Sequence, residues 1–246
     1  MNSVALDSDV AGVASLRLTA DSTLRLDQVF NVLLPLGVAQ IDLAGHALHV
    51  YGHERVYNSS VTEGTLHYAE GSVMHGIGTG RTVDASGATL DMQGFLMLDH
   101  GSFTVNVSNY LSRAQLGKSS YATEGVLNVW GRFTPATNQY WGCVMQDGST
   151  VDLSTAPLPF SLTTPTLSCV TSKDTVAFAD NAHVTLDCRG RYLRSGDYVL
   201  TWNEAPANLS TLVFSLDSRT ASTYAELRQD EDGVYVYRRP TIILIR

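Results

Sequence analysis

The pentapeptide LDMQG, residues 90–94, carries the pattern that decides the fold of this chain. An aliphatic residue is followed by Asp, then by an apolar residue, then by any residue and Gly. Alternate side chains of a β-strand point to opposite faces, so this order places two apolar side chains on one face and the Asp on the other. The Gly then favours a turn. The segment therefore predicts a short, half-buried strand that ends in a turn.

The same pattern occurs elsewhere in the chain. IDLAG (41–45) and LDCRG (186–190) are full copies, and VDL (151–153) is a partial one. Their spacing is unequal, whereas regular repeat arrays keep a constant period. Alternation of apolar and polar residues, punctuated by Gly, recurs along the chain without a long helical pattern. We expect an all-β protein, either an irregular, β-helix-like β-solenoid or a β-sandwich.

A proline-rich segment suggests a boundary. Residues 154–168 hold three of the seven prolines together with several Ser and Thr. Proline removes a backbone donor and is poorly tolerated in central strands. We predict two β units, an N-terminal domain over 1–155 and a smaller C-terminal domain over 169–246, joined by a linker over 156–168. A long strap across a single unit is the alternative.

Composition narrows the classes of function. The formal net charge is −8, with 16 Lys and Arg against 24 Asp and Glu, so we expect no nucleic-acid partner. The most apolar stretch, residues 29–43, contains Asn31, Pro35 and Asp42 and is too short for a membrane span. The polar residues after Met1 do not form a signal-peptide pattern. Nucleophile-elbow, P-loop, dinucleotide and HExxH motifs are missing, and we expect no cofactor.

The cysteines and histidines leave alternatives open. Cys143, Cys169 and Cys188 lack metal-ligand spacing, and burial as small apolar residues is the favoured interpretation. If a disulfide forms, Cys169–Cys188 is the preferred pair. Six of the seven histidines lie between residues 46 and 100, but His49 and His53 would be ~13 Å apart on one strand. We expect surface histidines and no metal, with a site across neighbouring strands as the alternative.

The stretch SKDTVAF (172–178) partly matches the Asp-Thr/Ser-Gly signature of aspartic peptidases. In those enzymes two carboxylates share one proton and together polarise a water. Asp174 and Thr175 are the candidate catalytic residues, although Val176 stands where the signature has Gly. A second carboxylate would come from Asp180, from Asp187 or from another subunit. The alternative is an exposed turn that opens a strand over 176–178.

Two further sets of residues suggest carbohydrate chemistry. Glycoside hydrolysis needs two carboxylates ~5 to ~9.5 Å apart. Four aspartates could supply such carboxylates, but each is the second residue of a repeat copy, and this equivalence indicates a structural role. They are Asp42, Asp91, Asp152 and Asp187. Tyr140 and Trp141 follow a polar loop and are the candidate substrate-binding pair, because exposed aromatic rings stack on sugars and anchor partners. We expect Trp130 to fill the core.

The C-terminal third resembles a known family. HVTLDCRGRYLRSGDYVLTWNEAP (183–206) and DGVYVYRRPTIILIR (232–246) are similar to autotransporter-associated β-strand repeat proteins. The resemblance rests on the turn at 196–198, the strand at 200–202 and the closing apolar strand. Such proteins are secreted or surface proteins of Gram-negative bacteria, abundant in mucin-degrading gut species. The resemblance implies an all-β protein that is secreted or held at the bacterial cell surface.

One suspected relative of this type is an aspartic-type mucin protease. The resemblance therefore implies a secreted aspartic-type peptidase that degrades mucin-like glycoprotein, with Asp174 as its catalytic residue. The alternative is a non-catalytic extracellular β-repeat module that binds mucin or glycan, or serves as a structural surface passenger. The sequence does not decide the oligomeric state.

Overall fold

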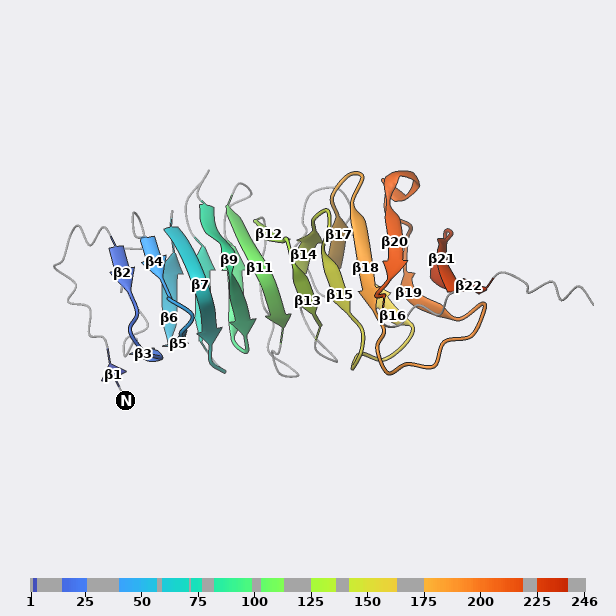
Figure 1. The fold of residues 1–246 in the computed structure, drawn as a ribbon. Helices are drawn as coiled ribbons and strands as arrows, with labels where there is room; N and C mark the ends of the chain where they lie inside the picture. The colour runs from blue at the N-terminus through green and yellow to red at the C-terminus, as the bar shows by residue number, and fades with distance from the viewer. Residues whose placement is uncertain are drawn as a thin grey trace, which may run out of the picture.

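The chain coils into an elongated stack of short strands, with the N-terminal strands at one end and β21 and β22 at the other (Figure 1). The computed structural model describes residues 2–3, 15–25, 40–56, 59–70, 72–76, 82–98, 103–112, 125–135, 142–162, 175–218 and 225–238. Its largest sheet has 15 strands, paired in parallel throughout. Parallel stacking of successive turns is the mark of a β-solenoid. The all-β prediction is confirmed, and of the two expected architectures the chain adopts the solenoid.

Two columns of stacked strands make up this sheet. Three long strands run through both columns, namely β7 (Ser59–Tyr68), β9 (Thr82–Met92) and β11 (Thr104–Ser112). The first column also contains β2 (Ser15–Arg17), β4 (Gln40–Asp42), β12 (Val126–Val129), β14 (Gly142–Met145) and β17 (Thr175–Phe178). The second column also contains β1 (Asn2–Ser3), β3 (Ser22–Arg25), β5 (Ala47–Tyr51), β13 (Arg132–Thr134), β15 (Thr150–Asp152), β18 (His183–Asp187) and β20 (Val213–Leu216).

Two smaller sheets accompany the columns. One is parallel and contains β6 (His53–Val56), β8 (Val73–Gly76) and β10 (Phe95–Leu98). The other contains β16 (Phe160–Leu162), β19 (Tyr198–Trp202), β22 (Gly233–Arg238) and β21 (Ala225–Gln229). In this second sheet β22 is antiparallel to both β19 and β21, so the parallel stacking stops here. We call β19, β21 and β22 the C-terminal cap.

Helical structure is minimal in the part of the chain that the structure describes. A single short 3-10 turn, η1 (Leu209–Thr211), precedes β20. None of the described residues forms a helix long and apolar enough to cross a membrane.

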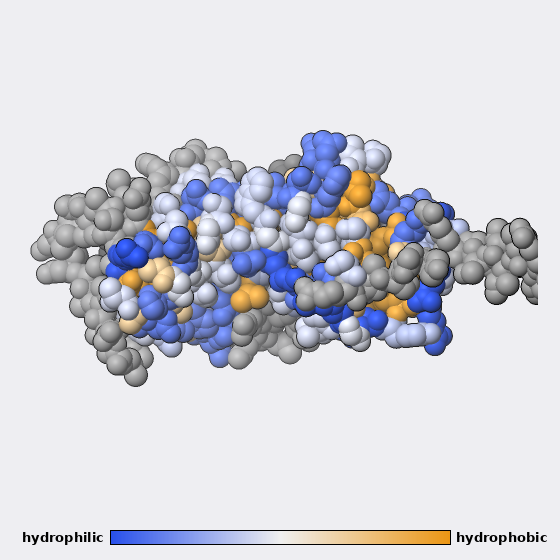
Figure 2. Space-filling model, viewed as in Figure 1, coloured by the Kyte–Doolittle hydropathy of each residue, from blue (hydrophilic) through white to orange (hydrophobic). Residues whose placement is uncertain are grey.

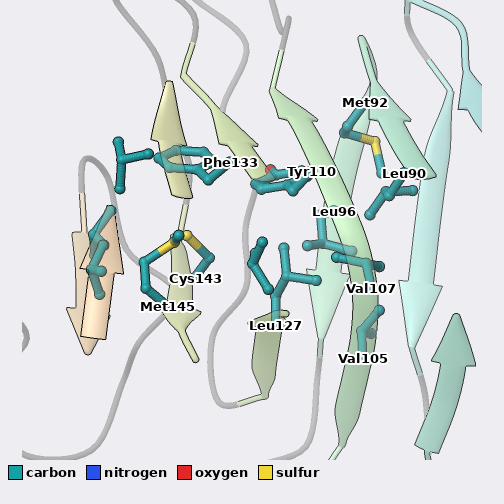
Figure 3. Close-up of a cluster of buried hydrophobic side chains, with 14 of the residues drawn as sticks. Leu90, Met92, Leu96, Val105, Val107, Tyr110, Leu127, Phe133, Cys143 and Met145 are labelled. Carbon is teal, nitrogen blue, oxygen red and sulfur yellow. The ribbon is translucent and has the colours of Figure 1, made fainter. Parts of the chain in front are cut away.

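The core consists of ladders of apolar side chains that follow the stacking direction. In the second column, the inward position is occupied on successive turns by Leu48, Leu66, Leu90, Tyr110, Phe133, Val151 and Leu186, all buried. A ladder of the first column contains Val83, Val105, Leu127, Cys143 and Val176. Figure 3 shows the rings of Tyr110 and Phe133 beside each other, with centroids 5.6 Å apart. Burial of these side chains, at ~25 cal/mol per Å² of apolar surface, is the main stabilising term.

The Asp of the repeat closes a turn. The backbone N–H of Ala44 donates to Asp42 Oδ1 at 2.8 Å, and the N–H of Ser154 donates to Asp152 Oδ1 at 3.1 Å. Asp187 receives the N–H of Arg189 in the same way. In such a turn, the Asp carboxylate accepts a hydrogen bond from a backbone N–H group that would otherwise need a partner on a neighbouring strand. Gly45 and Gly190, three residues after their Asp, have φ values of 82° and 76°, which glycine adopts without strain.

Two sequence expectations need correction. Trp130 does not fill the core, because it lies on the bend between β12 and β13 and is 51% exposed. Phe133, three residues later, takes the inward position instead. Asp42 does not hold a position equivalent to the other repeat aspartates, since it ends β4 in the first column while they lie in the second. Cys188 is a free thiol, so of the two alternatives for this residue the structure agrees with the favoured one, burial without a disulfide.

The thiols of Cys143 and Cys188 behave as buried apolar groups, as the favoured interpretation expects. Burial raises the pKa of Cys188 to about 12 and raises the pKa of Cys143 well above its ordinary value. Both thiols therefore stay protonated at neutral pH and are poor nucleophiles. Cys169 lies outside the described residues.

The described part of the proline-rich segment, residues 154–162, includes the strand β16. β16 lies within the predicted linker over 156–168, and it pairs with β19. On either side of this segment, β14 pairs with β17 and β15 pairs with β18. The division into units over 1–155 and 169–246 remains a prediction, and these strand pairs are the contacts that would join the two.

Candidate functional site

Of the four candidate catalytic and substrate-binding residues, Thr175 is the one that the structure describes. Tyr140, Trp141 and Asp174 lie outside the described residues, so their roles remain predictions. The residues that follow them in the chain, Gly142 and Thr175, are paired across β14 and β17. The strand expected after Asp174 is confirmed, and it begins at Thr175.

A row of polar side chains runs along the outward face of the second column. The register pairs Thr65 with Thr89, Thr89 with Asn109, Arg132 with Thr150, Thr150 with Thr185, and Thr185 with Ser215. Asn109 and Arg132 are connected by a hydrogen bond instead, in which the backbone N–H of Arg132 donates to Asn109 Oδ1 at 3.0 Å. All seven side chains are half-buried or exposed. We call this set the polar row: Thr65, Thr89, Asn109, Arg132, Thr150, Thr185 and Ser215.

The geometry of the polar row is periodic. Neighbouring strands of a sheet lie ~4.8 Å apart, so the row presents one hydroxyl, amide or guanidinium group at each such step. Asn109 Nδ2 donates to Thr89 Oγ1 at 3.2 Å, and Thr185 Oγ1 lies 3.4 Å from Ser215 Oγ. These contacts orient four of the seven side chains, and each of the hydroxyl groups involved has further hydrogen-bonding capacity for a ligand. On the face shown in Figure 2, polar and neutral residues cover the middle of the molecule, and apolar residues gather toward the C-terminal strands.

A second outward row lies two residues further along the same strands. At its N-terminal end, His67 Nδ1 is 3.0 Å from Asp91 Oδ2, and the rings of His49 and His67 lie edge to face with centroids 4.9 Å apart. The side chains of His67 and Asp91 are only 15% and 11% exposed. The pair is therefore a structural contact between two turns of the solenoid.

Further along the second row, two carboxylates stack on neighbouring turns. Asp152 pairs with Asp187 in the register of β15 and β18. Arg132 Nη1 bridges them, at 2.9 Å from Asp152 Oδ2 and 2.7 Å from Asp187 Oδ2. Arg189 adds two contacts from its Nε to Asp187, at 2.8 and 3.0 Å. The side chain of Asp187 has no exposed surface.

The electrostatics of this cluster oppose acid–base catalysis. Burial alone would raise the pKa of Asp187, but hydrogen bonds from Arg189 and Arg132 outweigh it and lower the pKa to about 2. A catalytic carboxylate dyad needs one member that stays protonated. Asp187 is ionised and enclosed by two guanidinium groups, so it does not suit the role of proton-sharing partner for Asp174. Asp152 and Asp187 therefore act as structural links between turns of the solenoid, the role that the repeat pattern indicates for them.

No group of three or more His, Cys, Asp or Glu side chains within the described ranges could hold a metal ion. The histidine-rich stretch instead distributes its side chains over different strands. His49 lies on β5 and His53 on β6, which belong to different sheets.

The sequence did not reveal the residues that connect successive turns of the solenoid. Arg132 lies on β13, in the turn of the solenoid before Asp152, and no local pattern marks it as the partner of Asp152 and Asp187. The polar row was also missed, because its members are far apart in sequence and become neighbours only through the register. Arg189 carried a usable signal, since it lies two residues after the Asp of a repeat copy.

Comparison of the chain with protein-family models, with curated proteins and with solved structures finds no match.

Proposed function

We propose that this protein is a non-catalytic extracellular β-solenoid module that binds glycan or glycoprotein along its side. The polar row carries the proposal. Its hydroxyl and amide groups recur at the strand spacing along one face, and an extended chain of sugars presents complementary hydroxyl groups at repeated intervals. Mucin-like glycoprotein is the proposed partner, and the bacterial surface or its surroundings the proposed location, both from the family resemblance.

The chemistry of the rows favours binding over turnover. The described carboxylates of the second row are engaged: Asp91 contacts His67, while Asp152 and Asp187 contact Arg132. The groups of the polar row are neutral apart from Arg132 and suit hydrogen bonding to sugar hydroxyls. A weak contact repeated over several turns gives useful total affinity through avidity.

Removal of two hydroxyl groups from the middle of the row tests this function. The double variant Thr150→Val and Thr185→Val keeps side-chain shape and strand propensity but removes two hydrogen-bonding groups. With about 0.5–1.5 kcal/mol per hydrogen bond, mucin affinity should fall about tenfold. Biolayer interferometry on immobilised mucin measures this change.

The control for that experiment is Thr201→Val. Thr201 Oγ1 lies 3.1 Å from Ser161 Oγ in the sheet of the C-terminal cap, away from the polar row. This variant should bind mucin as the unmodified protein does. Equal affinity of the double variant and the unmodified protein would remove the polar row as the binding surface.

We propose the aspartic-type peptidase as the second candidate function. Its supporting observation is the pairing of Gly142 with Thr175, because the candidate substrate-binding pair Tyr140 and Trp141 precedes one of these residues and Asp174 precedes the other. Thr175 and the residue that follows Trp141 in the chain therefore lie on adjacent turns of the solenoid.

The peptidase predicts mucin cleavage that depends on Asp174. Pure protein should be incubated with mucin across pH 4 to 8, with and without an aspartic-peptidase inhibitor and a chelator, and the products resolved on gels. Asp174→Asn should abolish cleavage while circular dichroism stays unchanged, and the inhibitor should act where the chelator does not. Cleavage at full rate by Asp174→Asn would contradict the peptidase proposal.

A further inference from the structure

A small cavity lies against the C-terminal cap. Its volume is about 100 Å³. One water needs ~10–15 Å³ of such space, so the cavity has room for several waters or for one polar group of a larger ligand. Whole small-molecule sites are ~300 Å³ or more, so the cavity suits the substituent of a sugar better than a complete free ligand. The described residues that line it are Arg191, Tyr192, Leu193, Leu216, Ala225, Val236 and Arg238.

The charged side chains that line the cavity are all positive. The lining includes two guanidinium groups and, among the described residues, no carboxylate. Arg191 Nη2 donates to the carbonyl of Ala156, and Arg238 Nη2 donates to the carbonyl of Leu193 at 2.8 Å. Neither side chain forms an ion pair within the part of the chain that the structure describes. Other arginines do pair with carboxylates: Arg17, Arg132, Arg189 and Arg228.

Arg191 also has an unused donor. Its Nε is buried and has no hydrogen-bond acceptor among the described residues. A buried donor without an acceptor is unfavourable. Because this Nε is enclosed by protein atoms, an acceptor in the cavity reaches it when the Arg191 side chain shifts, and the new hydrogen bond would favour that shift. Guanidinium groups bind carboxylate and sulfate oxygens through paired, charge-assisted hydrogen bonds.

The remaining lining fits the apolar side of a sugar ring. Leu216, Ala225 and Val236 provide aliphatic contacts. Tyr192 is 79% exposed, and the guanidinium carbon of Arg194 lies 5.6 Å from its ring centroid. An exposed aromatic ring held by a cation is a suitable platform for the C–H face of a sugar.

We propose that this cavity binds the carboxylate or sulfate group of an acidic sugar at the end of a glycan chain. The inference rests on the proposed glycan-binding function and specifies its ligand class. The two arginines would select glycan chains that carry an acidic sugar.

The experiment compares acidic and neutral probes on the full chain by isothermal titration calorimetry. The probes are sialyllactose, galactose 6-sulfate, neutral lactose and sodium sulfate. We expect at least one acidic sugar to bind at least tenfold more tightly than lactose and than the sulfate ion. The two acidic sugars show which acidic group is preferred.

Variants locate the binding. Arg238→Gln should remove the preference for the acidic sugar, and Arg191→Lys, which keeps the charge but loses Nε, should weaken it severalfold. Arg228→Gln is the matched control, because Arg228 lies on the cap but pairs with Glu226 outside the cavity. Melting temperatures within a few degrees of the unmodified protein show that each variant is folded.

The outcomes separate this inference from the proposed function. Equal binding of lactose and both acidic sugars, or an acidic preference unchanged in Arg238→Gln, would overturn the acidic-sugar site. Sulfate binding as tightly as the sugars would also overturn it, as an anion site without sugar recognition. If mucin binding depends on Thr150 and Thr185 but not on Arg238, the polar-row function stands and the cavity proposal fails. If the unmodified protein does not bind mucin, the proposed function fails, and the calorimetry still decides on the cavity.

Discussion

Asp187 shows how a single side chain holds three parts of the solenoid together. Its carboxylate receives the backbone N–H of Arg189 and so closes the turn after β18. The same group contacts the guanidinium of Arg189 and, from an earlier turn of the solenoid, that of Arg132. Removing the charge of Asp187 would leave both guanidinium groups with fewer acceptors in a partly buried place.

We predict that Asp187→Asn destabilises the protein by ~2 kcal/mol at pH 7, the usual size for hydrogen bonds to charged groups. Asn keeps the shape and one acceptor oxygen, so the loss reports the charge rather than a cavity. Urea denaturation followed by circular dichroism measures the change. The matched control is Asp42→Asn, whose ion pair with Arg17 is largely exposed and should contribute less than ~1 kcal/mol.

The pH dependence of this difference is part of the same prediction. The pKa of Asp187 in the folded protein is about 2, below the ordinary value of ~3.9 in an unfolded chain. Ionised Asp187 therefore stabilises the fold above about pH 4, and this contribution is lost as the pH falls toward 2. The stability gap between Asp187→Asn and the unmodified protein should close over that window. A gap that stays constant down to pH 2 would contradict the assigned charge interaction.

At the scale of the strand and turn, local pattern predicts much of the structure. The repeat at 90–94 places Leu90 inside the core and ends its strand with a turn, as the alternation of side chains requires. The Gly45 and Gly190 turns are also predictable, because an Asp three residues earlier closes the turn and glycine supplies the positive φ. These features depend only on residues close together in sequence.

Register and turn length were not predictable from the same pattern. Phe133 pairs with Val151, but Val151 pairs with Leu186, so the chain between stacked residues nearly doubles in length from one turn to the next. In addition, the residue that follows the inward-facing side chain is not Asp on every turn of the solenoid. Leu111 follows Tyr110, and Thr134 follows Phe133. The irregular spacing of the repeat copies therefore follows from the variable length of chain between stacked strands.

The sequence also did not decide which of two aromatic side chains, Trp130 or Phe133, enters the core near the bend between β12 and β13. Trp130 and Phe133 flank the same bend, and hydrophobicity alone favours the larger ring for the core. The register assigns Phe133 to the ladder with Tyr110 and Val151 and leaves Trp130 on the outer side of the bend. The polar row depends on the same long-range register, which is why the candidate binding surface emerged only with the structure.

At the scale of the whole molecule, the solenoid joins the two predicted units by strand pairing. β14 and β17, and β15 and β18, are parallel neighbours from the two sides of the proline-rich segment, and β16, which lies within that segment, is parallel to β19. In stacked architectures each turn is stabilised mainly by its neighbours, so these three pairs act as one interface between the N-terminal and C-terminal parts. The core runs through that interface, since Val151 and Leu186 are buried neighbours on its two sides.

We predict that the two parts remain associated after the chain is cut between residues 162 and 175. A site for a specific protease inserted there allows the folded protein to be nicked, and size-exclusion chromatography then measures whether the fragments elute together. The backbone hydrogen bonds of three strand pairs and the continuous core should hold them at micromolar concentration. The uncut insertion variant is the control, and it should elute and melt as the unmodified protein does. Fragments that separate, each with a strand-type circular dichroism spectrum, would show instead that the units over 1–155 and 169–246 fold independently.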